Sequence, residues 1–378
     1  METIRWVERD RDHEAEWHSE SGAPVPERVV VADDTMTADA AMRLASRGTA
    51  ILWRGDYHNA RQLLKAMDRR IERRASRRQR GEVTFAGHRA ERTQRATLMA
   101  HLVVELGPDR SLDLRRAPDV REACWAAYGP DTRPMVVALS ELLGVIGAHQ
   151  WQTKGVHVPA LGASIHPAYG VFSPVRGEYI DLVANAPLAQ PVPRTAFDLG
   201  TGTGVLAVVL AQRGVERVVA TDINPRAVAC ARDNAQRLGV ADRVEAVEAD
   251  LYPEGRADLV VCNPPWLPGE PTSDLEAGIY DPGSGMLRRF LSGLAEHLEP
   301  GGEGWLVISD LAEHLGLRAR EELLGLIDDA GLEVVDRLET VPRHQRASDA
   351  KDSLHAARRA EVTSLWRLTV AQGRQSAR

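Results

Sequence analysis

The chain has 378 residues, of which 43% are hydrophobic and 27% are charged, and its formal net charge is −7 at pH 7. This composition is typical of globular proteins, and the length allows two domains with separate cores. The negative charge argues against binding nucleic acid over the whole surface. We find no signal-peptide pattern, no apolar run long enough to span a membrane, and no metal-ligand or disulfide spacing among the three cysteines. We therefore expect a cytoplasmic protein without a metal.

The first 150 residues predict a mostly helical accessory domain that recognises the substrate. Residues 28–31 resemble a strand, and Thr37 suits the cap of a helix that ends before Gly48. Three more helices are expected over residues 58–80, 118–128 and 134–149.

Residues 151–194 predict a linker or hairpin segment, because its end, residues 186–193, is rich in proline. Residues 195–378 then predict the catalytic domain, in which strand and helix patterns alternate. Strands are expected at 195–199, 217–221, 244–248, 257–262 and 304–309, with helices at 205–213, 225–238, 285–297 and 319–330.

Repeated strand–helix units imply a parallel sheet with helices on both faces. The last two strands, expected at 332–340 and 361–370, suggest a hairpin at one edge. The fold class is therefore α/β, with a Rossmann-like sheet of seven strands.

A glycine loop follows the first strand of this sheet. Gly200, Gly202 and Gly204 are spaced G-x-G-x-G, whereas the dinucleotide fingerprint needs its third glycine where this chain has Val205. Glycines allow a ligand close to the backbone, and the helix that follows offers free N–H groups to a carboxylate. The loop therefore fits nicotinamide cofactors poorly, but it fits another nucleoside-bearing cofactor.

Two acidic residues end the next strands. Asp222 is placed to accept hydrogen bonds from both ribose hydroxyls. Asp250 ends the third strand, within reach of an adenine amino group. A loop-tip glycine or a capping aspartate is common alone, but the combination at strand ends indicates a cofactor site.

The run Asn263-Pro264-Pro265-Trp266 follows the fourth strand. The prolines remove N–H donors and stiffen the backbone, so the Pro264 carbonyl and the Asn263 side-chain oxygen become fixed acceptors. A planar NH₂ group can donate to both, and Trp266 offers it a flat face. The alternative is a Pro-Pro turn with the tryptophan as packing.

Together these motifs resemble a class I S-adenosylmethionine-dependent methyltransferase, over roughly residues 151–370. The resemblance implies S-adenosylmethionine as cofactor and a seven-stranded methyltransferase sheet. It implies that Asp198 and the glycine loop hold the methionine part, Asp222 the ribose and Asp250 the adenine. Thr201, Ile223, Leu251 and Asn263 are further candidates for contacts with the cofactor.

The Asn-Pro-Pro-aromatic motif resembles that of the HemK/PrmC-like protein glutamine methyltransferases. Residues 170–179, which include Arg176, and residues 279–287, which include Tyr280 and Asp281, resemble segments on either side of that family's motif. Two features depart from the family: Trp266 stands where tyrosine is usual, and the N-terminal domain is longer and does not match. Candidate substrate-binding residues are Asn263, Pro265, Trp266, Arg176, Tyr280, Asp281 and His344; catalytic candidates are Asn263, Pro264, Trp266 and Glu270.

The segment after Trp266 bears on the acceptor. Residues 267–287 contain four carboxylates, Glu270, Asp274, Glu276 and Asp281, and no lysine or arginine. An acidic rim would attract a cation and help to remove its proton, although a solvated loop has the same composition. We expect a guanidino or amino nitrogen of arginine, a peptide or a small molecule, or a protein glutamine amide.

The alternative acceptor is an exocyclic base amine in rRNA, tRNA or DNA. Residues 69–80 contain seven arginines, which can contact phosphates, but a solvated helix end is the favoured explanation and no aromatic residue is interleaved. Residues 342–360, with His344, should emerge on the active-site side and form part of a substrate lid. A third interpretation, a cofactor-binding scaffold without activity, requires an idle acceptor motif. The sequence leaves the oligomeric state open.

Overall fold

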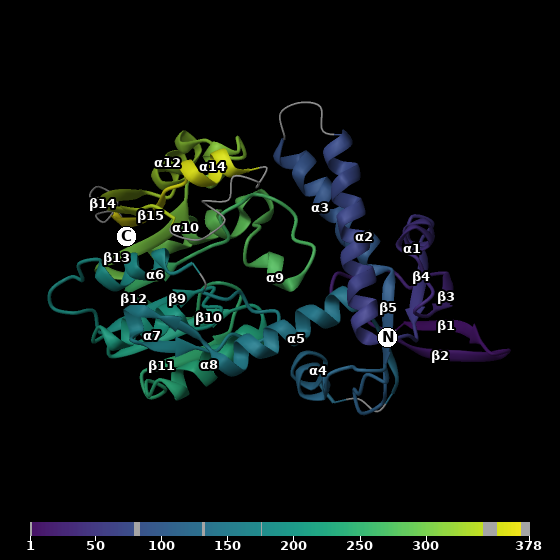
Figure 1. The fold of residues 1–378 in the computed structure, drawn as a ribbon. Coiled ribbons are helices and arrows are strands. Elements are labelled where there is room, and N and C mark those ends of the chain that lie inside the picture. Colours follow the sequence, from purple (N-terminus) through teal and green to yellow (C-terminus); the bar gives the residue numbers. More distant parts are fainter. Residues whose placement is uncertain (1, 79–83, 131–132, 175, 343–353, 372–378) are drawn as a thin grey trace. The chain divides into compact units, whose positions relative to one another are not determined.

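A computed structural model describes residues 2–78, 84–130, 133–174, 176–342 and 354–371. The chain divides into two compact units, Met1–Gln150 and Trp151–Arg378, and the division falls within helix α5 (Leu139–Lys154). Figure 1 shows the elements of both units. Among the described residues, no helix combines the length and the apolar character needed to cross a bilayer.

The first unit contains a six-stranded mixed sheet in the order β1-β2-β6-β5-β4-β3. Its strands are β1 (Thr3–Glu8), β2 (Arg11–Trp17), β3 (Arg28–Ala32), β4 (Thr49–Trp53), β5 (Leu102–Leu106) and β6 (Met135–Ala138). Its helices, besides the first part of α5, are α1 (Ala38–Ala45), α2 (Tyr57–Arg78), α3 (Phe85–Ala100) and α4 (Arg121–Tyr128).

The expectation of a mostly helical first domain missed this sheet. Three expected helices are present as α1, α2 and α4, and the expected strand is β3. However, β4, β5 and β6 are runs of four or five mostly buried residues. Such short apolar runs carry no period that separates a strand from a buried helix. The helix expected over residues 134–149 therefore begins later, at Leu139, and residues 135–138 form β6.

The second unit is built on a seven-stranded sheet in the order β11-β10-β9-β12-β13-β15-β14. The strands are β9 (Thr195–Leu199), β10 (Arg217–Asp222), β11 (Val244–Glu248), β12 (Ala257–Cys262), β13 (Leu298–Ser309), β14 (Leu332–Thr340) and β15 (Thr363–Val370). The first five run parallel, and β15 runs antiparallel to both of its neighbours. This confirms the predicted sheet and the antiparallel pair at its edge.

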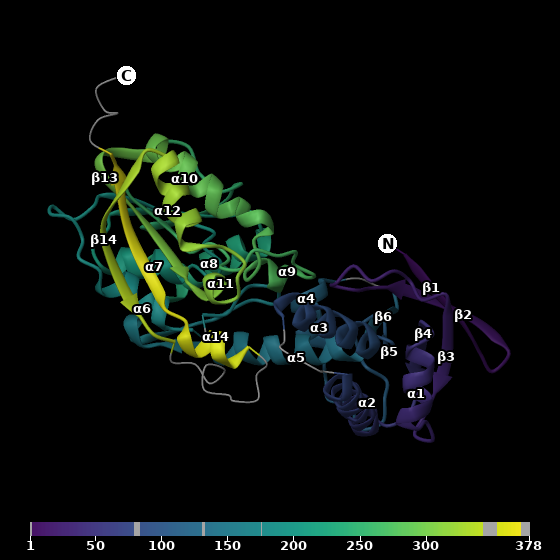
Figure 2. The same cartoon turned by 90° about the horizontal axis from the view of Figure 1, so that it is seen from above.

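Helices cover both faces of this sheet. On one face lie α6 (Glu178–Asn185), α7 (Val205–Gln212) and α8 (Pro225–Arg237), and on the other lie α10 (Gly285–His297) and α12 (Arg320–Asp329) (Figure 2). Each face has its own cluster of buried apolar side chains. Short elements complete the unit: β7 (Val156–Val158), η1 (Pro159–Leu161), β8 (Ala163–Ile165), α9 (Asp274–Ala277), η2 (Pro282–Ser284), α11 (Leu311–His314) and α14 (His355–Ala360).

The strand order reverses at β9. The chain proceeds from β9 to β10 and β11 on one side, then crosses back to β12 on the other side of β9. Ligands of open α/β sheets bind at the carboxyl ends of the strands beside such a reversal. The glycine loop after β9 and the motif after β12 both lie there.

Candidate functional site

The glycine loop turns from β9 into α7 through three left-handed residues. Gly200, Gly202 and Gly204 have φ of 68°, 56° and 79°. A Cβ on Gly204 would lie 3.0 Å from the Cα of Ala231 in α8, so this glycine lets the two helices pack closely. A Cβ on Gly202 would meet no atom within 4 Å, which means that the backbone borders open space there. This is the side on which a ligand can approach the bare backbone.

Asp198 holds the loop from inside. Its carboxylate is 1% exposed, and Oδ2 accepts hydrogen bonds from Thr201 Oγ1 (2.6 Å) and from the backbone N–H of Ala207 (3.0 Å). Burial raises the pKa of Asp198 to about 6, and these two hydrogen bonds oppose the rise. These contacts of Asp198 and Thr201 lie within the loop and α7, so both residues shape the site; direct contact with a cofactor stays a prediction.

Asp222 faces the same loop from the end of β10. Its Oδ2 accepts a hydrogen bond from Gly202 N (2.9 Å), and its Oδ1 accepts one from Asn224 N (2.9 Å). Burial raises the pKa of Asp222. The next side chain, Ile223, is 68% exposed, which is unusual for a large apolar group. A carboxylate beside an uncovered apolar surface fits a ribose with its base.

Asp250 follows β11 and is exposed. Both of its carboxylate oxygens lie 2.8 Å from Nη1 of Arg289 in α10. Leu251 is buried with φ of 83°, and its carbonyl accepts a hydrogen bond from Thr221 Oγ1. The segment after β11 is thus tied to β10. Arg289 is not predictable as a partner of Asp250, because nothing local in the sequence links the two residues.

The motif Asn263–Trp266 begins at the end of β12. Trp266 Nε1 donates a hydrogen bond to Asn263 Oδ1 (2.8 Å). Pro264 is buried, and the other three residues of the motif are half-buried. A carbonyl oxygen has two lone pairs, so the Asn263 amide oxygen can accept a second hydrogen bond while the indole fixes its direction. The oxygens of Asn263 and Pro264 therefore stay candidates for receiving an acceptor NH₂ group.

The aromatic ring of Trp266 already contacts another side chain of the protein. The Cζ of Arg176 lies 4.9 Å from its ring centroid, and the ring also packs against both apolar clusters of the unit. Arg176 is held in turn by the buried carboxylates of Glu178 (3.2 Å) and Glu361 (2.9 Å). The expectation that Trp266 stacks on the acceptor has to allow for this guanidinium. Sequence reasoning missed both glutamates.

The acidic segment after the motif is a closed loop. Leu267 and Tyr280 form a bridge, and the N–H of Asp281 donates to the carbonyl of Leu267 (2.9 Å). The Asp281 carboxylate is buried and accepts hydrogen bonds from the backbone N–H groups of Met286 (2.9 Å) and Leu287 (3.1 Å). Asp281 thus anchors the start of α10, and its expected role as a substrate ligand stays a prediction.

The other carboxylates and the tyrosine of this segment lie in different surroundings, and their expected roles stay predictions. Glu276 accepts hydrogen bonds from the backbone and hydroxyl of Thr272, within the loop itself. Tyr280 is buried, with its ring 3.2 Å from where a Cβ of Gly269 would stand. Glu270 is exposed. The acidic composition therefore reflects local structure in part, and it is a weak argument for a cationic acceptor.

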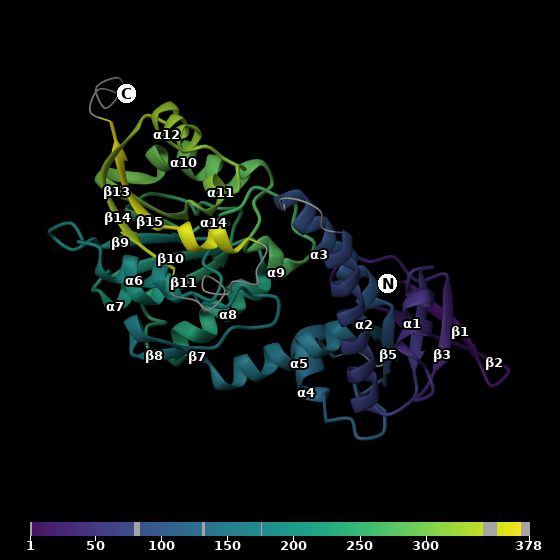
Figure 3. The same ribbon diagram turned by 45° about the horizontal axis from the view of Figure 1, so that its top comes forward.

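The expected lid is described only in part. His344 and residues 343–353 lie outside the described residues. Strand β14 runs parallel to β13, so the insertion begins at the carboxyl edge of the sheet, and α14 leads from it into β15 (Figure 3). The role of His344 stays a prediction. In the arginine cluster, residues 79–80 also lie outside, and Arg70 forms an ion pair with Asp39.

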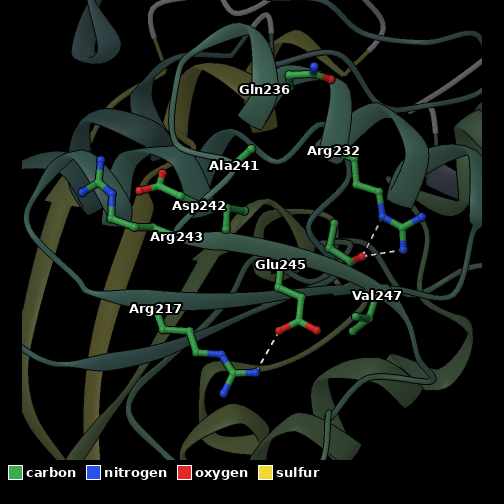
Figure 4. A pocket seen from close by; sticks show the side chains of 10 residues that line it. Arg217, Arg232, Gln236, Ala241, Asp242, Arg243, Glu245 and Val247 are labelled. Carbon is green, nitrogen blue, oxygen red and sulfur yellow. Dashed lines mark hydrogen bonds and ion pairs between the residues drawn. The ribbon is translucent and has the colours of Figure 1, made fainter.

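A surface hollow of about 630 Å³ lies at the edge strand β11 and is unrelated to these motifs (Figure 4). Its charged residues serve the fold: Arg217 pairs with Glu245 (2.8 Å), and Arg232 donates to the carbonyl of Ala246. In the described parts of the chain, no cluster of three or more histidine, cysteine or acidic side chains suits a metal ion.

The strand order, the glycine loop and the acidic strand ends define a class I methyltransferase domain, a class whose cofactor is S-adenosylmethionine. Residues 163–320 match the family described as the methyltransferase small domain.

Within that class, similar proteins support the resemblance to the HemK-like enzymes. The chain is 36% identical over 188 residues to a release factor glutamine methyltransferase of Cereibacter sphaeroides, covering 46% of this chain and 62% of that protein. It is 34% identical over 168 residues to a protein of the same name from Geobacter sulfurreducens (40% and 55%). It is 55% identical over 71 residues to a ribosomal protein L11 methyltransferase of Pelotomaculum thermopropionicum (18% and 23%). The chain thus spans less than two thirds of the length of these relatives.

Proposed function

We propose that this protein transfers a methyl group from S-adenosylmethionine to an uncharged planar nitrogen, the side-chain amide of a glutamine in a protein. One observation carries the proposal: the Asn263 amide, fixed by Trp266, follows β12, the strand that pairs with β9 and its glycine loop. A donor site and an acceptor site at neighbouring strand ends are what methyl transfer requires.

The cofactor supplies a methyl group that is activated by a positively charged sulfur. The N–H groups at the start of α7 would hold its carboxylate. Asp222 would accept hydrogen bonds from the ribose hydroxyls, and the exposed Ile223 would pack against the base. Asp222 also accepts a hydrogen bond from Gly202 N, where the backbone borders open space.

The acceptor is held by the motif after β12. The oxygens of Asn263 and Pro264 accept its two N–H groups, which turns the face of the nitrogen toward the methyl group. On transfer the S–CH₃ bond of the cofactor would break as the N–CH₃ bond forms, leaving the thioether S-adenosylhomocysteine. The nitrogen would then release one proton to solvent or to the exposed Glu270, a candidate proton acceptor. Positioning supplies most of the rate enhancement, because a well-oriented pair reacts far faster than free reactants.

Two arguments favour an amide over a cation. The carboxylates of Asp281 and Glu276 are engaged inside their own loop, which removes much of the acidic rim. In addition, two of the relatives are named as glutamine methyltransferases that act on release factors. An acceptor in the translation machinery would place the protein in the cytoplasm.

The test is transfer of labelled methyl groups into extract separated into protein, RNA and small molecules. We expect label in the protein fraction, recovered as N-methylated glutamine after enzymatic digestion. Asn263→Ala should abolish transfer even at cofactor concentrations that calorimetry shows to be saturating, whereas Asn185→Ala, at an exposed position of α6, should behave as the wild type. Label in RNA or on arginine, or transfer that survives Asn263→Ala, would contradict the proposal.

A further inference from the structure

A guanidinium group of the protein itself lies at the acceptor motif. Arg176 stands over the Trp266 ring at 4.9 Å. Its Nη2 donates to Oε1 of Glu361 (2.9 Å), and its Nε donates to Oε1 of Glu178 (3.2 Å). All four side chains belong to the second unit, so this arrangement is internal to the methyltransferase domain.

This arrangement is the one that proteins use to bind a guanidinium ligand. A flat cation on an indole face, paired with carboxylates, combines cation–π attraction with charge-assisted hydrogen bonds. Arg176 occupies such a site from within the chain. A substrate arginine or amine would need the same aromatic face and the same carboxylates.

Glu361 is the buried carboxylate that holds Arg176 in this position. The residue is 0% exposed, and its Oε1 also accepts a hydrogen bond from Ser309 Oγ (2.6 Å). Its Oε2 is buried and has no hydrogen-bond partner among the described residues. A buried carboxylate without a counter-charge is costly, so Glu361 holds Arg176 in place strongly.

We propose that Arg176, positioned by Glu361, makes the acceptor site selective for an uncharged amide by occupying the place on Trp266 that a cationic acceptor would take. The identity of the amide acceptor rests on the proposed function, but the occupation of the cation site does not. Arg176 and Glu361 are positioning residues: they fix the indole, and the indole fixes the Asn263 amide.

The test refills the site with a free cation. Protein labelled with 5-fluorotryptophan is followed by fluorine NMR, and the Trp266 signal is assigned from Trp266→Phe. In Arg176→Ala, millimolar guanidinium chloride should shift that signal. The affinity of this variant for guanidinium should be at least roughly tenfold higher than its affinity for urea, the uncharged counterpart. The wild type should respond to neither. Adding Glu361→Gln to Arg176→Ala should weaken guanidinium binding by roughly tenfold.

A matched control removes another arginine whose side chain is mostly buried and ion-paired. Arg367 pairs with Glu303 (2.7 Å), which also accepts a hydrogen bond from the indole of Trp305 (3.0 Å). Arg367→Ala should leave the Trp266 signal insensitive to guanidinium. If Arg176→Ala fails to fold, Arg176→Gln keeps donors and most of the volume and serves in its place.

Two results would overturn the inference. One is a folded Arg176 variant whose Trp266 signal does not shift with guanidinium, and the other is a wild type that binds guanidinium as tightly as the variant does. Methyl transfer provides a second reading. Arg176→Ala should lower methyl transfer, because the indole that holds the Asn263 amide loses its partner. Guanidinium should restore at least part of this transfer, and urea should not. A wild type that methylates no glutamine would refute the proposed function, while the NMR result would still decide the role of Arg176.

Discussion

Replacing Asp198 with asparagine separates the shape of this carboxylate from its charge. The asparagine oxygen can still accept the hydrogen bonds from Thr201 and Ala207, but the side chain no longer titrates. Burial raises the pKa of Asp198 from 3.8 to about 6, so the folded protein binds this proton more tightly than the unfolded chain does. The stability from Asp198 is therefore fully present below about pH 3.8 and is lost as the pH rises toward 6.

At about 1.36 kcal/mol for each pKa unit, the loss amounts to about 3 kcal/mol for this fully buried group. Urea unfolding of both proteins between pH 4 and pH 8, followed by tryptophan fluorescence, gives the free energies of unfolding. The value for Asp198→Asn minus the wild-type value should rise by up to about 3 kcal/mol between pH 4 and pH 7. Asp258→Asn, at another hydrogen-bonded aspartate of the sheet, controls for the loss of a carboxylate. A difference that stays constant across this range would refute the reasoning.

Two further changes probe the cofactor side. Gly204→Ala should lower the free energy of unfolding by about 1–3 kcal/mol more than Gly239→Ala does. Both glycines have positive φ, but only Gly204 faces the α8 backbone. Equal losses in urea unfolding would contradict this. Arg289→Ala should change stability by less than about 1 kcal/mol, since its pair with Asp250 is half-exposed, and it should raise cofactor affinity in calorimetry by freeing the carboxylate. Asp250→Ala should lower that affinity, and unchanged affinity in both variants would remove Asp250 from the site.

The features that were predicted correctly depend on residues that are neighbours in the sequence. Asp222 ends a strand, and the glycine loop and Asn263 each follow one directly, so their common edge followed from the parallel sheet alone. The seven strands of the second unit could be predicted from the sequence because helices separate most of them. The six-stranded sheet of the first unit was not, because its short apolar strands carry no distinguishing period.

The direction of a side chain was beyond the sequence. Asp281 looked like part of an acidic rim, yet it turns inward onto the N–H groups that open α10. Glu361 stands far along the chain from Arg176 and reaches it only because β15 inserts beside β13. Such pairs depend on tertiary packing, which a single sequence does not display.

The closed loop after the acceptor motif has a consequence for how this domain can change. Its two ends are fastened by the bridge between Leu267 and Tyr280 and by the hydrogen bond from Asp281 to Leu267. Beyond it, a Cβ on Gly200 would meet Met286 Cε, which brings α10 against the cofactor loop. Insertions between the fastened ends can therefore be accommodated without displacing the glycine loop or the start of α10. The loop is a place where the chain can change in length and sequence while the edge of the sheet keeps its geometry.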